Sequence, residues 1–229
     1  MRQTAHAFTA QEGAVAMGYL LFLPAAYGEN GHLRWPLILF LHGAGERGSD
    51  LERLRGHGLT RILEERADSF PFVVVSPQCP AETRWVDHLD TLSALLDEVV
   101  RTHAIDEQRV YLTGMSMGGQ GAWGLALRYP DRFAAVAPIC GPRLRQAEIA
   151  ERMHVLRDTP VWVFHGAKDE VVPLEHSMAM ADALERAGGN VRLTVYPEAG
   201  HDAWTETYDN PALYEWFLQH ALALAGDEQ

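Results

Sequence analysis

The 229-residue sequence has only two cysteines, Cys79 and Cys140, and each follows an apolar run. A single pair cannot form the disulfide framework of a small secreted domain. We therefore expect both cysteines to be reduced, partly buried side chains. The eleven histidines are scattered along the chain, so the sequence predicts no metal site.

Long apolar runs and an excess of basic residues are also missing. No segment approaches the roughly 20 apolar residues that span a bilayer, and residues 1–11 lack the charged head and apolar stretch of a signal peptide. The net charge of −12 argues against nucleic acid and anionic membranes as main partners, because both require basic patches. We therefore expect a cytoplasmic protein.

Short apolar runs alternate with longer stretches of helical periodicity. Several runs are apolar throughout, which is typical of strands covered on both faces. The predicted strands are 17–23, 37–41, 72–75, 110–112, 134–137, 161–164 and 191–196. The predicted helices are 87–102, 121–129, about 145–157, 178–184 before a glycine stop at Gly188-Gly189, and 213–224 after a cap at Asn210-Pro211.

This alternation predicts an α/β fold in one domain covering residues 1–229. We expect a three-layer α/β/α sandwich around a mainly parallel, twisted sheet of about seven to eight strands. Only about twenty residues separate the strands that end at 137 and begin at 161. That length accommodates one short helix and no lid domain, so an open, shallow active site is predicted.

The segment Gly114-Met115-Ser116-Met117-Gly118 connects a predicted strand to a predicted helix. A serine on such a sharp turn projects its hydroxyl above the sheet edge, and the flanking glycines let the backbone approach closely. The pentapeptide alone is weak evidence, but its strand-to-helix context and two further matches downstream strengthen it. We predict that Ser116 is a nucleophile.

Two later strand ends carry the partners that a nucleophilic serine needs. The hydroxyl needs a base to take its proton, and the base needs an acid that orients it. The strand 161–164 runs into Asp169, and the strand 191–196 runs into His201. The order serine, acid, histidine is that of an α/β-hydrolase. We predict Asp169 as the acid and His201 as the base, with Glu170 as a substitute acid.

A glycine-rich turn, residues 42–48, follows another predicted strand and can aim backbone N–H groups inward. It lacks the lysine and hydroxyl residue of a phosphate-binding P-loop. The predicted oxyanion hole combines the N–H groups of Ala44 and Met117. His42 and His165 each precede a glycine at a strand end, and we expect both to be structural, bonding loop carbonyls.

Together these segments resemble small lidless serine hydrolases of the α/β-hydrolase fold. They are similar to the phospholipase/carboxylesterase and poly(hydroxyalkanoate)-depolymerase-like esterases, including predicted peptidases of that group. The resemblance implies ester hydrolysis through an acyl-enzyme, with Ser116, Asp169 and His201 as the triad, Ala44 and Met117 as oxyanion donors, and no cofactor. Dienelactone hydrolases share the architecture but use a cysteine nucleophile, so Ser116 argues against that family. The segments that carry the likeness are 41–48, 112–119, 163–169 with Val172-Pro173, and 196–201.

The substrate pocket is predicted from loop placement. Trp85 follows a strand end and Trp204 lies three residues past His201, so either indole is a candidate pocket wall. Gln120 lies on the helix after the nucleophile and is a third candidate, whereas Trp123 is expected to pack inward. Without a lid, short acyl esters of about two to six carbons are the expected substrates, with aryl or hydroxycinnamoyl esters if the indoles line the cleft.

Three functions remain open from the sequence. A serine carboxylesterase acting on a small-molecule ester is the first. A serine peptidase of the same fold is the second, and a non-catalytic hydrolase-fold binding protein is the third. The sequence leaves the oligomeric state open.

Overall fold

A computed structural model describes residues 3–10, 16–29, 31–145 and 151–223 of the chain. Within these residues the strands form one eight-stranded sheet in the order β1-β2-β4-β3-β5-β6-β7-β8. The strands from β3 to β8 pair in parallel, whereas β2 pairs antiparallel with both β1 and β4. The prediction of a mainly parallel sheet is thereby confirmed. The strand bounds are β1 Gln3–Phe8, β2 Met17–Phe22, β3 Trp35–Leu41, β4 Val73–Pro77, β5 Ile105–Met115, β6 Ala135–Ile139, β7 Val161–Gly166 and β8 Val191–Tyr196.

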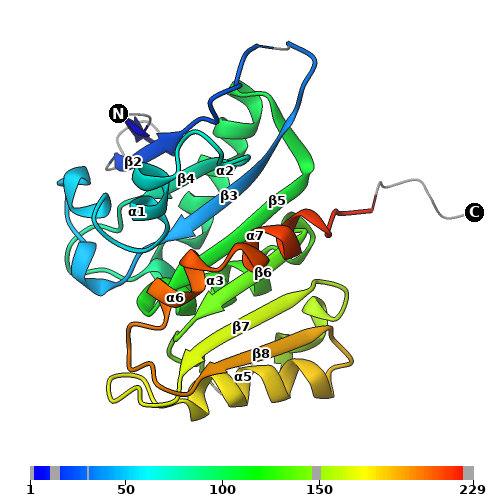
Figure 1. The fold of residues 1–229 in the computed structure, drawn as a ribbon. Helices are drawn as coiled ribbons and strands as arrows, with labels where there is room; N and C mark the ends of the chain where they lie inside the picture. Colours follow the sequence, from blue (N-terminus) through cyan, green and yellow to red (C-terminus); the bar gives the residue numbers. More distant parts are fainter. Residues whose placement is uncertain (1–2, 11–15, 30, 146–150, 224–229) are drawn as a thin grey trace, which may run out of the picture.

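Helices cover both faces of the sheet and produce the three layers seen in Figure 1. One hydrophobic cluster joins the sheet to α2, α3 and α5, and a second joins the opposite face to α1, α6 and α7. The helix bounds are α1 Gly58–Glu65, α2 Leu89–Thr102, α3 Met117–Arg128, α5 Glu175–Arg186, α6 Trp204–Asp209 and α7 Pro211–Leu218. Short 3-10 helices are η1 Ala44–Glu46, η2 Leu51–Leu54, η3 Trp85–Asp87, η4 Pro130–Arg132 and η5 Met153–Leu156.

The side chains of β3 show how one strand serves both clusters. Leu37, Leu39 and Leu41 belong to the cluster under α2 and α3. Ile38 and Phe40, which alternate with them, belong to the cluster on the other face. Alternation of this kind follows from the two-residue period of a strand, and it requires apolar residues at every position because both faces are covered.

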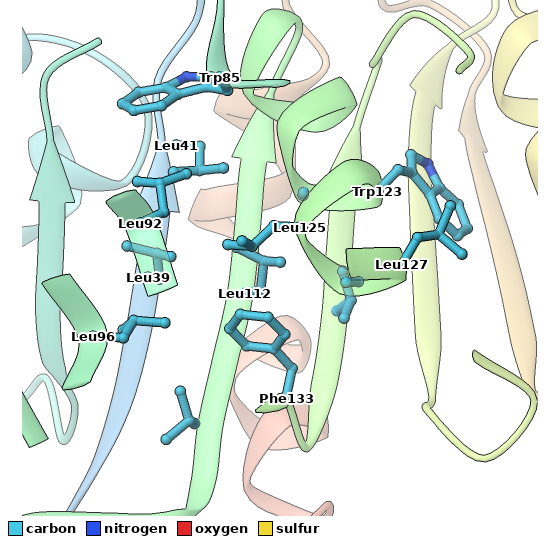
Figure 2. Close-up of a cluster of buried hydrophobic side chains, with 14 of the residues drawn as sticks. Leu39, Leu41, Trp85, Leu92, Leu96, Leu112, Trp123, Leu125, Leu127 and Phe133 are labelled. Carbon is cyan, nitrogen blue, oxygen red and sulfur yellow. The ribbon is translucent and has the colours of Figure 1, made fainter. Parts of the chain in front are cut away.

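Figure 2 shows the cluster between the sheet and helices α2 and α3. The indole of Trp85 lies next to Leu41, at the end of the cluster toward which the strand arrows point. Trp123 on α3 is buried on the other side of that helix, as predicted. The core therefore extends to the carboxyl ends of the strands, where the loops described below begin.

Several elements differ from the sequence prediction. Strand β1 was not predicted, because it is an edge strand on which Gln3 alone is fully buried. Helix α1 was also not predicted, since it begins at Gly58 with a φ of +57° and no side-chain cap. The predicted last helix corresponds to α7, which begins after the predicted cap at Asn210 but ends at Leu218, whereas the short helix α6 before it was not predicted. Leu224, the predicted end of the last helix, lies outside the described residues.

The predicted helix at about 145–157 falls partly on residues 146–150, which lie outside the described residues. The structure has η5 at Met153–Leu156 in the remainder of that stretch. In the described parts of the chain, no helix is both long and apolar enough to cross a bilayer. Cys79 and Cys140 are free and buried.

Candidate active site

Ser116 lies on the sharp turn between β5 and α3, and its backbone has a φ of +54°. A side-chain-bearing residue rarely adopts this conformation, which costs of order 1–3 kcal/mol and is typical of functional turns. The turn is held by the bond from the Ser116 N–H to the carbonyl of Ile139 at 2.9 Å. A Cβ on Gly118 would overlap the carbonyl oxygen of Leu41, so only glycine allows this approach between α3 and the end of β3.

The three predicted side chains come together above the carboxyl ends of their strands. His201 Nε2 lies 2.9 Å from Ser116 Oγ, and His201 Nδ1 lies 2.7 Å from Asp169 Oδ2. The other carboxylate oxygen of Asp169 accepts the N–H groups of Val171 and Val172, each at 2.9 Å. The carboxylate of Asp169 can only accept a hydrogen bond, so the imidazole of His201 carries its proton on Nδ1. Its Nε2 therefore presents a free lone pair to the serine hydroxyl.

The electrostatics keep the carboxylate of Asp169 charged. Its side chain is fully buried, and this burial by itself raises the pKa. Hydrogen bonds from His201, Val172 and Val171 outweigh it, so the pKa of Asp169 lies below its ordinary value. An ionised carboxylate at this position stabilises the imidazolium that forms when His201 takes a proton.

Glu170, the substitute acid, is exposed, and no bond joins it to His201 in the described structure. The position of Asp169 behind the imidazole is therefore the one that the geometry supports.

Two backbone N–H groups are available beside Ser116. Ala44 is the first residue of η1, and Met117 is the first residue of α3. The N–H groups at the start of a helix have no partner within the helix. A Cβ on Gly43 would lie 3.8 Å from the Cβ of Ser116, so the loop that carries Ala44 lies against the serine.

His42 and His165 have the structural contacts that the sequence predicted. His42 Nε2 accepts the N–H of Cys79 at 2.9 Å, so Nδ1 is the protonated nitrogen and donates to the carbonyl of Gly43 at 2.6 Å. His165 Nε2 lies 2.8 Å from the carbonyl oxygen of Val172. It also lies 3.2 Å from Asp169 Oδ2, so this ring supports the loop of the carboxylate.

The prediction that Trp85 lines the substrate pocket is wrong. Its side chain is fully buried, and its indole N–H donates to the carbonyl of His42 at 2.9 Å. The loop after β4 folds back over Leu41, so the indole has no surface left for a ligand. Trp85 supports the glycine-rich turn instead, a role that no local sequence signal indicates.

Trp204 and Gln120 lie where a ligand can reach them. The half-buried indole of Trp204 packs edge-on against His201, with ring centroids 5.2 Å apart. Gln120, on the first turn of α3, contacts the guanidinium of Arg84 at 3.4 Å and the carbonyl of Arg143 at 3.3 Å. It lines an open cleft of about 570 Å³ with Val86, Asp87, Arg143, Leu144, Arg145 and His176.

Cys140, Asp169 and His201 form a group whose possible ligand atoms lie within 4.8 Å of one another. The thiol is buried, and burial raises the pKa of Cys140 far above its ordinary value. The neutral thiol is a poor metal ligand, and Asp169 and His201 already bond each other. The described site therefore does not favour a metal centre.

The sequence profile of the dienelactone hydrolase family matches residues 4–215, a range that includes Ser116, Asp169 and His201. The chain belongs to the dienelactone hydrolase family. The argument against this family from the serine at position 116 is therefore wrong, because the match includes Ser116 in the nucleophile turn. The wider assignment to the α/β-hydrolase esterases is confirmed.

Several proteins similar to this chain are named as esterases. The chain is 32% identical over 148 residues to a bifunctional acetylxylan esterase/xylanase of Neocallimastix patriciarum, covering 60% of the chain and 20% of that protein. It is 24% identical over 223 residues to acyl-protein thioesterase 1 of Gibberella zeae, covering 81% and 90%. The chain thus spans about a fifth of the first relative and most of the second.

Solved structures show the same fold. A thermostable esterase superposes with a TM-score of 0.81 at 31% identity, covering 96% of the chain and 63% of that structure. A ferulic acid esterase superposes with a TM-score of 0.74 at 20% identity, covering 93% and 95%. The second likeness shows the fold alone.

Proposed function

We propose that the protein is a serine carboxylesterase that hydrolyses carboxylic esters through an acyl-enzyme. The observation that carries the proposal is the continuous hydrogen-bonded chain from Asp169 through His201 to Ser116. Family membership and relatives named as esterases and thioesterases support the same chemistry.

In the first half of the reaction, Ser116 Oγ attacks the ester carbonyl carbon while His201 Nε2 takes the hydroxyl proton. The carbonyl electron pair moves onto its oxygen, and the N–H groups of Ala44 and Met117 stabilise this oxyanion. When the carbonyl re-forms, the bond to the alcohol oxygen breaks. The alcohol leaves with the proton from His201, and the acyl group remains on Ser116.

In the second half, water replaces the alcohol. His201 takes a proton from the water as its oxygen attacks the acyl carbon, and the same two N–H groups stabilise the second oxyanion. Collapse breaks the bond to Ser116 Oγ, which recovers its proton from His201. The products are a carboxylic acid and the free enzyme.

For the substrate we propose short-chain esters, with aryl or hydroxycinnamoyl esters as the extension. The name of the matched acetylxylan esterase supports the short-chain class, and the indole of Trp204 beside His201 supports the aromatic extension. Trp204 beside the imidazole and Gln120 at the cleft are the proposed substrate contacts. The cleft begins within one helical turn of the nucleophile, because the Gln120 N–H bonds the carbonyl of Ser116 at 3.1 Å.

A fluorophosphonate probe tests the proposal, since it phosphonylates only an activated serine. We expect rapid labelling of the wild type and none of Ser116→Ala, with kcat on 4-nitrophenyl butyrate reduced on the order of 10⁶-fold. His201→Ala should reduce kcat by a similar factor, because the three residues of the triad act as a unit. Unlabelled, inactive wild-type protein would instead favour a binding protein, and faster cleavage of peptides than of esters would favour a peptidase.

A further inference from the structure

The glycine-rich turn between β3 and η2 has an unusual pattern of hydrogen bonds. Each of its six consecutive carbonyls, from His42 to Arg47, accepts a bond from a side chain. The donors and distances are Trp85 to His42 at 2.9 Å, His42 to Gly43 at 2.6 Å, Arg47 to Ala44 at 3.0 Å, Arg53 to Gly45 at 2.7 Å, Gln78 to Glu46 at 2.7 Å, and Arg53 to Arg47 at 3.2 Å.

This pattern determines where the N–H groups of the turn point. A peptide unit is planar and trans, so the N–H of one residue points opposite to the carbonyl of the residue before it. The Gly43 carbonyl is held by the ring of His42, whose side chain is only 1% exposed. The N–H of Ala44 is therefore directed away from the buried ring, and the loop that carries it lies against Ser116.

Arg53 differs from the other donors because it lies outside the core. It is exposed on η2, yet its guanidinium bonds the carbonyl of Gly45 within η1 and that of Arg47 directly after η1. A guanidinium presents its donors as a rigid fork, so it can hold both carbonyls at a fixed separation. A lysine ammonium is a single point on a flexible chain and cannot reproduce the fork.

We infer that Arg53 is a positioning residue of the oxyanion hole, which holds the Ala44 N–H in the orientation required by the transition state. This inference rests on the proposed ester hydrolysis, because that reaction forms the oxyanion that the Ala44 N–H would stabilise. Donors aimed in advance cost no reorganisation during the reaction, and loss of one such donor lowers kcat by about 10²–10³-fold in other enzymes. If the donor is loosened rather than removed, the loss of kcat should be smaller, about 10–100-fold.

The chain offers a matched control in Arg55. It lies two residues further along, and its guanidinium bonds the carboxylates of Glu52 and Glu64 and the carbonyl of Gln3. None of these partners belongs to the turn. Arg55→Met therefore removes the same charge and the same type of side chain without touching the carbonyls of residues 42–47.

The experiment compares Arg53→Met, Arg53→Lys and Arg55→Met with the wild type. Four quantities are measured: kcat and KM on 4-nitrophenyl butyrate, the Ki of a butyl trifluoromethyl ketone that mimics the tetrahedral intermediate, and the melting temperature. For both Arg53 variants we expect kcat to fall about 10–100-fold and KM to stay within about twofold. The Ki should rise by the same factor as kcat/KM falls. Arg55→Met should behave as the wild type.

Three outcomes would overturn the inference. They are wild-type kcat in Arg53→Lys, a rise in KM with unchanged kcat, or an equal loss of activity in Arg55→Met. Fluorophosphonate labelling and the peptide-versus-ester comparison, both made on the wild type, keep these outcomes separate from a failure of the esterase proposal, because that proposal is tested without any change at Arg53.

Discussion

His42 and His201 show how the surroundings of a histidine decide whether it has a structural role or can take part in proton transfer. His42 is buried, and both of its ring nitrogens bond main-chain groups, the carbonyl of Gly43 and the N–H of Cys79. His201 is about one-fifth exposed, and its nitrogens bond only side chains. A ring whose nitrogens are both committed to the backbone cannot exchange protons with a substrate, whereas His201 presents its lone pair to a hydroxyl.

The first prediction concerns the acid stability of His42. Burial, together with the positive charges of Arg47 and Arg53, lowers the pKa of this ring to about 4, although its bond to Gly43 opposes the shift. Between pH 6.5, the ordinary value, and pH 4 the unfolded chain therefore binds more protons at this site than the folded one. The contribution of neutral His42 to the free energy of unfolding is therefore fully present above pH 6.5 and is lost as the pH falls through 4. The shift corresponds to about 3 kcal/mol of unfolding free energy.

Urea denaturation at intervals from pH 4 to 7 measures this loss. His42→Gln keeps a donor and an acceptor at the position but cannot gain a proton, so its unfolding free energy should depend less steeply on pH. Glu46 lies 3.8 Å from the ring and partly offsets the cost of protonation, which makes 3 kcal/mol an upper figure. Equal slopes for the two proteins would show that His42 does not couple acid to unfolding.

At the scale of elements, helix α3 positions Ser116, the proposed nucleophile, by approaching the sheet closely. Its first two glycines lie against backbone rather than side chains: a Cβ on Gly118 would overlap the carbonyl of Leu41, and one on Gly119 would meet Gly141 at 2.9 Å. Backbone cannot move aside as a flexible side chain can. The start of α3 is therefore held at one distance from β3 and from the loop after β6.

Alanine substitutions within α3 test this close approach. Gly118→Ala should force the end of β3 and the turn after it away from Ser116, reducing fluorophosphonate labelling at least 100-fold and destabilising the fold by about 1–3 kcal/mol. Gly124→Ala is the control, because its Cβ would meet Val86 at 3.5 Å, an ordinary contact. Alanine also favours helix by up to ~1 kcal/mol, so this variant should melt no lower than the wild type. Wild-type labelling of Gly118→Ala would refute the argument.

At the scale of the whole molecule, the parallel sheet assembles the site. Strands β3, β5, β7 and β8 all run parallel, so the loops at their carboxyl ends meet at one edge. Open α/β sheets bind ligands at this edge. Ser116 follows β5 near the middle of the sheet, and Asp169 and His201, the proposed acid and base, follow β7 and β8 on one side of it.

The third prediction concerns acyl-chain length, which depends on the walls of the site as a whole. The cleft at Gln120 is lined by arginines, an aspartate and a histidine as well as by Val86 and Leu144, so it offers limited apolar surface to a long chain. In a series of 4-nitrophenyl esters, kcat/KM should be highest between about two and six carbons. A maximum at twelve carbons or more would contradict the proposal and would point to an apolar tunnel.

The sequence by itself determined seven of the eight described strands, β2 to β8, and three strand-end positions, those of Ser116, Asp169 and His201. These features are local: periodicity reports which faces are buried, and a tight turn requires glycine whatever surrounds it. It also indicated correctly that His42 and His165 bond loop carbonyls.

Only the tertiary structure decided what surrounds the serine. The burial of Trp85, the edge strand β1 and the two bonds of Arg53 depend on contacts between segments that no local pattern connects. A tryptophan after a strand end can line a pocket or pack in the core. Trp85 packs in the core because its loop folds back over Leu41. Such choices are made by packing, because burial is a property of the assembled chain and not of any one residue.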